Sequence, residues 1–255
     1  MDSRFFTPNN DFTLLGTQHW LAILFFTAVG YVLIRWGRAS SPKMQHRIGL
    51  VLSCVISLSI LSYTAIKVFV GPFDIQKDLP LHLCNFLALT LPIFAFMRKY
   101  WMYEILVFWV LAGTAQGVLT PDLDEGFPHY RFFKYWVEHA GLVVYMIYAS
   151  VIYGMRPKFK SIFKAFGAIQ IYLVFIIAVN ALVGSNYLFL MRKPEHPSLL
   201  DLLGDWPYYI LVEELLIFPF FIVIFYGFKA ADYLSDRYRD KQVAWNRVQD
   251  VTRSR

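Results

Sequence analysis

Long apolar stretches alternate with short polar segments along almost the whole chain. Each stretch is about 20 residues long, which is the length of α-helix that crosses the hydrocarbon core of a bilayer. Because the bilayer core offers the backbone no hydrogen bonds, such stretches fold as helices. The pattern predicts about seven transmembrane helices, over residues 19–36, 47–70, 79–97, 100–119, 130–153, 162–183 and 207–228. The predicted fold is therefore all-α, a polytopic membrane helix bundle.

The composition also indicates a membrane protein. Hydrophobic residues fill 57% of the 255 positions and charged residues only 16%, with a mean hydropathy of +0.46. A soluble domain carries about 25% charged residues. No repeat or shift in composition marks a second domain, so residues 1–255 are predicted to form a single multi-pass domain, with a short basic cytoplasmic tail at about 231–255.

The placement of lysine and arginine predicts the orientation. Basic residues collect at 35–47, 98–99 and 156–164 and again in the tail, which are alternate ends of the predicted spans. Cytoplasmic loops carry such an excess, so we expect the N-terminus outside and the C-terminus in the cytoplasm. The net charge of +6 is spread over these loops rather than gathered in one patch, so no nucleic-acid partner is predicted. The opposite side carries fewer basic residues: Arg4, Lys77, Arg131, Arg192 and Lys193, with Lys67 and Lys134 inside spans near that side.

Polar residues inside the spans converge on the predicted outer half of the membrane. Ionisable side chains are expensive to bury there, so they are functional candidates. Hydrogen bonding between helices is the alternative role, above all for the amides. The candidates for a polar cavity are His82, Cys84, Asn85, Gln116, Glu138, His139, Asn180, Glu213 and Glu214.

Cys84 is the candidate nucleophile. Pro80 suits a first helical position, which would place Cys84 in the first two turns of its span. A thiol nucleophile needs a base and a group that orients the base. His82 lies two residues away and points about 200° from Cys84 on a regular helix, so the base must come from another span, and His139 is best placed by depth. The alternative is that Cys84 is only a small residue that packs between helices.

The orienting group for His139 is expected on another helix. Glu138 is its sequence neighbour and points elsewhere on a regular helix, whereas Glu213 or Glu214 could reach it from the last span. A metal site is a competing interpretation, with His82, His139 and one glutamate as three ligands. No pair of ligands has His-x-x-x-His or Glu-x-x-His spacing, so the sequence predicts neither a metal nor another cofactor.

The long loop at 184–206 adds two basic candidates. Arg192 and Lys193 are predicted beside the cavity mouth, where lipid phosphates lie. They could bind a headgroup phosphate or simply anchor the loop at the interface. Ser198 could begin a short helix in the same loop, with Asp201 as its capping-box partner.

Several motifs together resemble one known family. They are Leu79-Pro-Leu-His-Leu-Cys84, Leu119-Thr-Pro-Asp-Leu123, Phe127-Pro-His-Tyr-Arg-Phe-Phe133, Glu138-His139, Asn186-Tyr187, Arg192-Lys-Pro-Glu-His-Pro-Ser-Leu-Leu-Asp-Leu-Leu203 and Asp205-Trp-Pro-Tyr-Tyr209. The chain resembles the YwaF-like bacterial integral membrane family over residues 79–224. Animal relatives of that family include a transmembrane acyltransferase that remodels ether phospholipids through a cysteine.

The resemblance implies lipid acyl chemistry in a bacterial cytoplasmic membrane. His82 and His139 correspond to the histidines of the animal enzyme, whereas its Pro-Cys-His motif places the cysteine at Leu81. The expected function is a phospholipid acyltransferase or lipid ester hydrolase, with membrane phospholipids as partners. His139 would be the base, and either Cys84 would attack or both histidines would activate a hydroxyl or water.

Two other function classes stay open at this point. A transporter or binding protein for a small polar or lipid molecule would use the glutamates as proton or ligand sites, and a structural membrane protein would use the polar groups only between helices. The residues expected to contact substrate are Asn85, Gln116, Glu138, Asn180, Arg192, Lys193, Glu213 and Glu214.

Overall fold

The computed structural model describes residues 11–193 and 199–253. Within those ranges the chain is built from helices and loops, without a β-strand. The α-helices are α1 (Thr17–Arg38), α2 (Pro42–Phe69), α3 (Leu83–Met97), α4 (Tyr100–Trp109), α5 (Ala115–Leu119), α6 (Tyr130–Ile152), α7 (Phe159–Val183) and α8 (Tyr208–Arg253). A π-helix, η2 (Val110–Thr114), joins α4 to α5, and two 3₁₀ helices, η3 (Tyr187–Phe189) and η4 (Leu199–Leu203), lie between α7 and α8.

The helices are those of a polytopic membrane protein. Six helical stretches in the described residues are long and apolar enough to cross a membrane, and α4, η2 and α5 together count as one of them. The remaining predicted span, residues 79–97, is the shorter apolar helix α3. The all-α membrane bundle predicted from the sequence is therefore confirmed.

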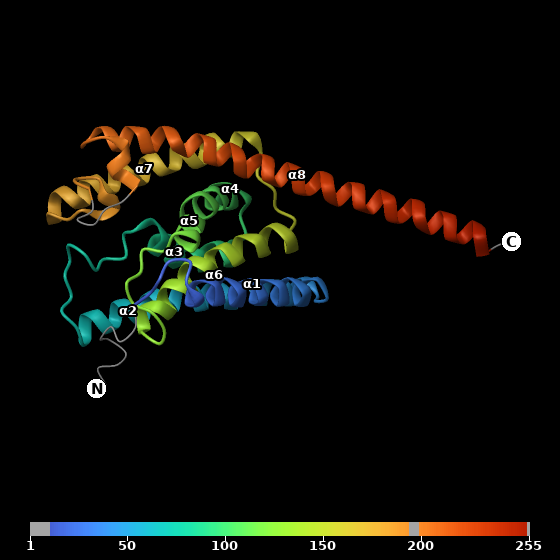
Figure 1. Ribbon diagram of the computed structural model, residues 1–255, viewed down its shortest axis with the longest axis horizontal. Coiled ribbons are helices and arrows are strands. Elements are labelled where there is room, and N and C mark those ends of the chain that lie inside the picture. The colour runs from blue at the N-terminus through green and yellow to red at the C-terminus, as the bar shows by residue number, and fades with distance from the viewer. Residues whose placement is uncertain (1–10, 194–198, 254–255) are drawn as a thin grey trace.

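The helices pack in layers (Figure 1). Helices α1, α2 and α6 lie together on one side, and α7 and α8 lie together on the other. Between them lie α3, α4 and α5, with α3 against α2 and α6 and α4 against α7. The C-terminal part of α8 extends beyond the rest of the bundle.

The core lies around the central helices. Leu87, Leu91 and Phe94 of α3 are fully buried, as are Tyr103 and Phe108 of α4. Although α3 is too short to cross the bilayer as an ideal straight span, it is buried on several sides by its neighbours. Its N-terminus is therefore fixed inside the protein rather than at the lipid boundary.

The start of α3 differs from the prediction. The helix begins at Leu83, so Pro80 is not its first residue and His82 is its N-cap, with an extended backbone. Hydrogen bonds from other segments hold the preceding residues out of the helix: the Tyr172 hydroxyl donates to the Leu81 carbonyl at 2.9 Å, and the Leu79 N–H donates to the Tyr187 hydroxyl at 3.0 Å.

Tyr187 anchors this segment a second time. Its hydroxyl donates to the Ile75 carbonyl at 2.7 Å. Burial raises the pKa of Tyr187 above its ordinary value, so the hydroxyl keeps the proton that this bond requires.

Two other helices also differ from their predicted bounds. Helix α7 begins at Phe159, three residues before the predicted start, and α8 runs on to Arg253, so most of the predicted tail is helical. Residues Leu199–Leu203 form a 3₁₀ helix, whereas Ser198 lies outside the described residues.

Candidate active site

Cys84 and His139 lie side by side, although 55 positions separate them in the chain. Cys84 is in the first turn of α3 and His139 is in the middle of α6. Their side chains are close enough to interact electrostatically, and the Cys84 Sγ lies 3.5 Å from the Thr114 Oγ1 of η2. The thiol is half-buried, so it is not sealed inside the core. The structure thus brings a thiol and an imidazole together from two helices.

One nitrogen of His139 is held by the protein backbone. The Nδ1 atom lies 3.0 Å from the carbonyl oxygen of Tyr135. Because a carbonyl only accepts, Nδ1 carries the hydrogen, and Nε2 is left as the acceptor for a proton from the thiol. The Tyr135 ring stacks on the imidazole with 4.0 Å between centroids and 14° between planes, which fixes its rotation.

Helix α5 closes the site behind the imidazole. A Cβ atom at Gly117 would lie 2.7 Å from His139 Cδ2 and 3.1 Å from the Tyr135 hydroxyl oxygen. That hydroxyl donates to the Gly117 carbonyl at 2.8 Å. Only glycine lets the α5 backbone approach this closely. Thr114, the last residue of the π-helix η2, lies beside Cys84, and Gly117 of the following helix α5 lies beside His139. Short π-helices are frequent at functional sites.

Glu138 places a buried negative charge beside the imidazole. Its side chain is 0% exposed, with Oε2 2.7 Å from Lys134 Nζ and 3.9 Å from His139 Nδ1. This carboxylate stabilises a positive charge on the ring when a proton arrives. The expectation that Glu213 or Glu214 orients His139 is wrong.

The backbone carbonyl of Tyr135 performs that orienting role instead. The side chain of Glu214 accepts a hydrogen bond from Gln170 on α7, and Glu213 is exposed on α8.

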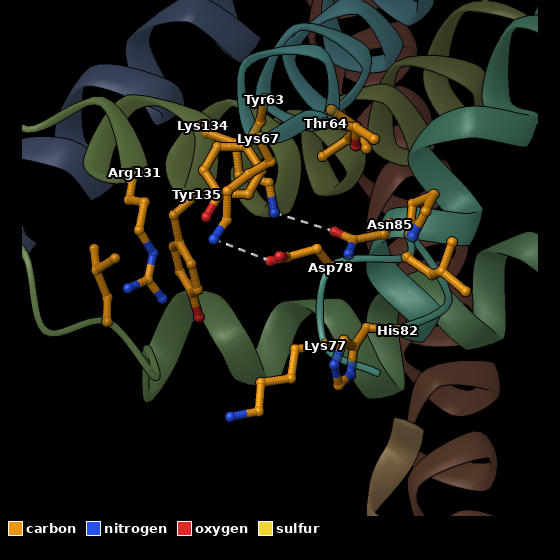
Figure 2. A pocket seen from close by; sticks show the side chains of 14 residues that line it. Tyr63, Thr64, Lys67, Lys77, Asp78, His82, Asn85, Arg131, Lys134 and Tyr135 are labelled. Carbon is orange, nitrogen blue, oxygen red and sulfur yellow. Dashed lines mark hydrogen bonds and ion pairs between the residues drawn. The ribbon is translucent and has the colours of Figure 1, made fainter. Parts of the chain in front are cut away.

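A pocket of about 360 Å³ adjoins this pair. It lies between the end of α2, the segment that leads into α3, and the start of α6 (Figure 2). Lys134 donates to Asn85 Oδ1 at 3.1 Å within it, and Lys67 Nζ lies 3.3 Å from Asp78 Oδ1. The polar lining residues are Tyr63, Thr64, Lys67, Lys77, Asp78, His82, Asn85, Arg131, Lys134 and Tyr135.

Two of the predicted site residues line the pocket rather than the thiol site. His82 packs its ring against Tyr187 and Phe189, with centroids 5.5 Å and 6.2 Å away. Asn85 contributes its side chain from the first turn of α3. The pocket and the Cys84–His139 pair share Tyr135, which lines the first and stacks on the second.

Asn180 has a structural environment. It is buried near the end of α7, where its Oδ1 accepts hydrogen bonds from the Ser185 hydroxyl at 2.7 Å and the Tyr187 N–H at 2.8 Å. Its Nδ2 donates to the Tyr187 carbonyl at 3.0 Å. The amide therefore holds the loop after α7 through both its oxygen and its nitrogen.

The other predicted contact residues lie away from the pocket. Gln116 is exposed on α5, and neither Arg192 nor Lys193 is among the lining residues. Lys193 Nζ lies 3.8 Å from one carboxylate oxygen each of Asp201 and Asp205. Over the described residues, no three His, Cys, Asp or Glu side chains gather in a group that could hold a metal ion.

The residues of this site lie within the part of the chain that matches a known membrane protein family. The sequence profile of the TMEM164 family matches residues 14–225. The chain is a member of the TMEM164 family. The comparison with curated proteins and the comparison with solved structures gave no match. The TMEM164 match spans the Cys84–His139 pair and every residue that lines the pocket, and it ends within α8.

Sequence patterns alone missed part of this TMEM164-family site. Thr114, Gly117 and Tyr135 carry no motif that marks them as neighbours of a histidine. The pocket lysines Lys67 and Lys134 do carry a signal, because a cation inside a span is costly unless it has a partner. They were interpreted as topology signals, although their depth in α2 and α6 indicates a polar site.

Proposed function

We propose that this TMEM164-family membrane protein is a thiol-dependent acyltransferase that acts on acyl esters of glycerophospholipids. The observation that carries the proposal is the close approach of Cys84 and His139 from two helices, with the Nδ1 of His139 fixed on the Tyr135 carbonyl. This is the arrangement of nucleophile, base and orienting group that cysteine catalysis requires. The resemblance to the YwaF-like bacterial family and its animal acyltransferase relative supports the same chemistry.

The first half-reaction forms an acyl-enzyme. The Cys84 thiol passes its proton to His139 Nε2, and the sulfur attacks the ester carbonyl carbon of the lipid. The tetrahedral intermediate collapses with loss of the lipid alkoxide, which takes the proton from His139 and leaves as a lysophospholipid. A thioester on Cys84 remains.

The second half-reaction returns the thiol. An acceptor hydroxyl gives its proton to His139 Nε2 and attacks the thioester carbonyl, and the departing sulfur takes the proton back. A lysophospholipid acceptor gives acyl transfer, and water gives hydrolysis, so the same site accounts for either outcome.

The first turn of α3 assists both steps. The N–H groups at the start of a helix have no partner within the helix, and the His82 side chain does not cap them. They and the helix dipole stabilise negative charge on the sulfur and on the ester oxygen. The Thr114 hydroxyl, 3.5 Å from the sulfur, is a further donor.

The decisive experiment uses purified protein in lipid nanodiscs with a phospholipid labelled in its acyl chain. Formation of labelled product is followed together with the intact mass of the protein, which detects the acyl group on Cys84. Wild-type protein should form product and a thioester, while Cys84→Ala should form neither. His139→Ala should lose about 10²–10⁴-fold in rate, the usual cost of a missing general base.

Cys54 supplies the matched control. It is the other cysteine of the chain, also half-buried, and lies on α2. Cys54→Ser should keep both activity and adduct. Turnover that persists in Cys84→Ala would exclude the thiol and leave His139 to activate a hydroxyl or water directly. Turnover at the wild-type rate in His139→Ala would refute the acyltransferase proposal.

A further inference from the structure

The pocket beside the Cys84–His139 pair has a cationic lining. Lys67, Lys77, Arg131 and Lys134 all contribute to it, whereas Asp78 is the one carboxylate among the lining residues (Figure 2). Basic side chains at this density form a binding site for anions, with phosphate the best fit for lysine and arginine donors.

Asp78 is not free to receive a positively charged group. Its Oδ1 lies 3.3 Å from Lys67 Nζ, and its Oδ2 accepts the Asp74 N–H at 2.8 Å. Both oxygens are therefore engaged within the protein. A ligand ammonium would meet lysine and arginine side chains here and would have to displace Lys67 to reach a carboxylate.

The remaining cations differ in how far they are neutralised. Arg131 pairs with Glu125 at 2.5 Å, and Lys134 pairs with Glu138 at 2.7 Å. Lys77 is exposed and has no ion pair among the described residues. The four cations face three carboxylates, Asp78, Glu125 and Glu138, so the site keeps one net positive charge, which Lys77 carries.

Asn85 adds a neutral donor to the same surface. Its Oδ1 accepts from Lys134 at 3.1 Å, which leaves the two hydrogens of Nδ2 for another partner. Lys134 also lies over the Tyr63 ring, 5.4 Å from its centroid, so that ring already has its cation. Donors are therefore present for phosphate oxygens, while the Asn85 oxygen and the Tyr63 ring already have a partner in Lys134.

We propose that this pocket is a binding site for a phosphate-ester headgroup that carries no ammonium group, as in phosphatidylglycerol or phosphatidic acid. The same lining disfavours the zwitterionic ethanolamine and choline headgroups, because the net charge of the site is positive and its lining carboxylate, Asp78, is already paired with Lys67. The proposal rests on the proposed function in one respect, that the bound lipid is also the acyl substrate.

The position of the pocket fits that role. Asn85 directly follows Cys84 in the first turn of α3, and Tyr135 links the pocket wall to the His139 ring. A phosphate held by Lys134 and Asn85 therefore directs the adjoining glycerol backbone toward the thiol. The pocket and the Cys84–His139 pair thus have two helices in common, α3 and α6.

Binding is measured without turnover by use of the full-length Cys84→Ala protein in phosphatidylcholine nanodiscs. A fluorescent phosphatidylglycerol is bound and then displaced by unlabelled phosphatidylglycerol, phosphatidic acid or phosphatidylethanolamine. We expect the two anionic lipids to compete about tenfold better than phosphatidylethanolamine, the scale of one hydrogen-bonded charge. Sodium phosphate and glycerol phosphate are added in parallel as water-soluble competitors.

Lys77 provides the sharpest variants because it is exposed and, within residues 11–193 and 199–253, makes no ion pair that its loss would disrupt. Lys77→Gln should lower the preference for anionic lipid about threefold to fivefold, and Lys77→Glu should abolish or reverse it. Arg192→Gln is the matched control, since it removes one positive charge from the loop between α7 and α8, outside the pocket. That variant should keep the preference.

Three results would overturn the headgroup site. They are equal competition by phosphatidylethanolamine in Cys84→Ala, an equal loss of preference in Arg192→Gln, and displacement of the lipid by sodium phosphate as readily as by phosphatidic acid. A strong preference combined with no turnover in the wild-type protein would support the headgroup site and refute the acyltransferase proposal. Turnover in the wild-type protein without any preference for anionic lipid would support the acyltransferase proposal and refute the headgroup site.

Discussion

Gly117→Ala is the substitution that tests most directly whether His139 must keep its present position. The new Cβ atom would lie 2.7 Å from His139 Cδ2, whereas ordinary van der Waals contact begins at 3.4 Å. It would also lie 3.2 Å from Nε2, the nitrogen that remains as a proton acceptor because Nδ1 is bound to the Tyr135 carbonyl. Either α5 or the imidazole must therefore move by at least the difference, about 0.7 Å.

The imidazole cannot move without losing contacts. Its Nδ1 is bound to the Tyr135 carbonyl and its face is stacked on the Tyr135 ring. A displacement of about 1 Å at a reacting group can lower a rate about 10²-fold. The overpacking itself costs about 1–3 kcal/mol of stability, offset by about 1 kcal/mol because alanine favours a helix over glycine. We therefore expect a folded protein whose chemistry is about 10–100-fold slower.

The assay has two readouts in a Cys54→Ser background. The rate of alkylation of Cys84 by iodoacetamide reports the thiol and its base without any lipid, and product formation from a labelled phospholipid reports the whole reaction. Both should fall in Gly117→Ala, while the melting temperature changes little. Gly113→Ala is the control, because its Cβ would meet only Leu83 Cδ2, at 3.6 Å.

Unchanged alkylation and turnover in Gly117→Ala would show that the position of His139 is irrelevant to both. An equal loss in Gly113→Ala would show that any added methyl group near η2 has this effect. Either result would refute the argument that Gly117 positions the base.

Three further outcomes are expected. Tyr135→Phe removes the hydrogen bond from the hydroxyl to the Gly117 carbonyl but keeps the ring stacked on His139. Its kcat should therefore fall only about threefold to tenfold, which corresponds to the usual 0.5–1.5 kcal/mol of one hydrogen bond. Tyr135→Ala removes the stacked ring as well, so its kcat should fall much further in the same turnover assay. Asn180→Ala leaves loop groups unpaired at a cost of about 2 kcal/mol, so the melting temperature should drop by about 4–8 °C with turnover per folded protein unchanged. A cytoplasm-dependent reporter fused after Arg255 should be active, and activity at the N-terminus instead would reverse the orientation predicted from charge.

Helix positions followed from the sequence because apolar length is a strong signal in a membrane. The exact start of α3 did not follow, since Pro80 is compatible with a first helical turn and the bonds that exclude it come from Tyr172 and Tyr187, far along the chain. The end of α8 was also missed, because the polar residues after the membrane span lower hydropathy without ending the helix.

The site followed from the sequence in part. Depth along the helices suggested that His139 and Cys84 could meet, and the structure brings the two side chains close together. Depth did not reveal rotation about each helix axis, which is why Glu214 and Asn180 were grouped with them although each bonds elsewhere. The group that orients His139 is a backbone carbonyl, and a backbone group has no residue type by which a sequence could reveal it.

The π-helix Val110–Thr114 has a consequence for the spacing of the chain. Its wider turn holds one more residue than an α-helical turn, so it sets the angular phase of α5 relative to α4. Deletion of Leu111 would restore regular helix and rotate α5 by about 100°. Trp109 would keep its bond to the Ala165 carbonyl, while Gly117 would turn away from His139. The number of residues between Trp109 and Gly117 is thus important for the site, whatever their identity. A scan of single deletions would reveal this, whereas a scan of substitutions would not.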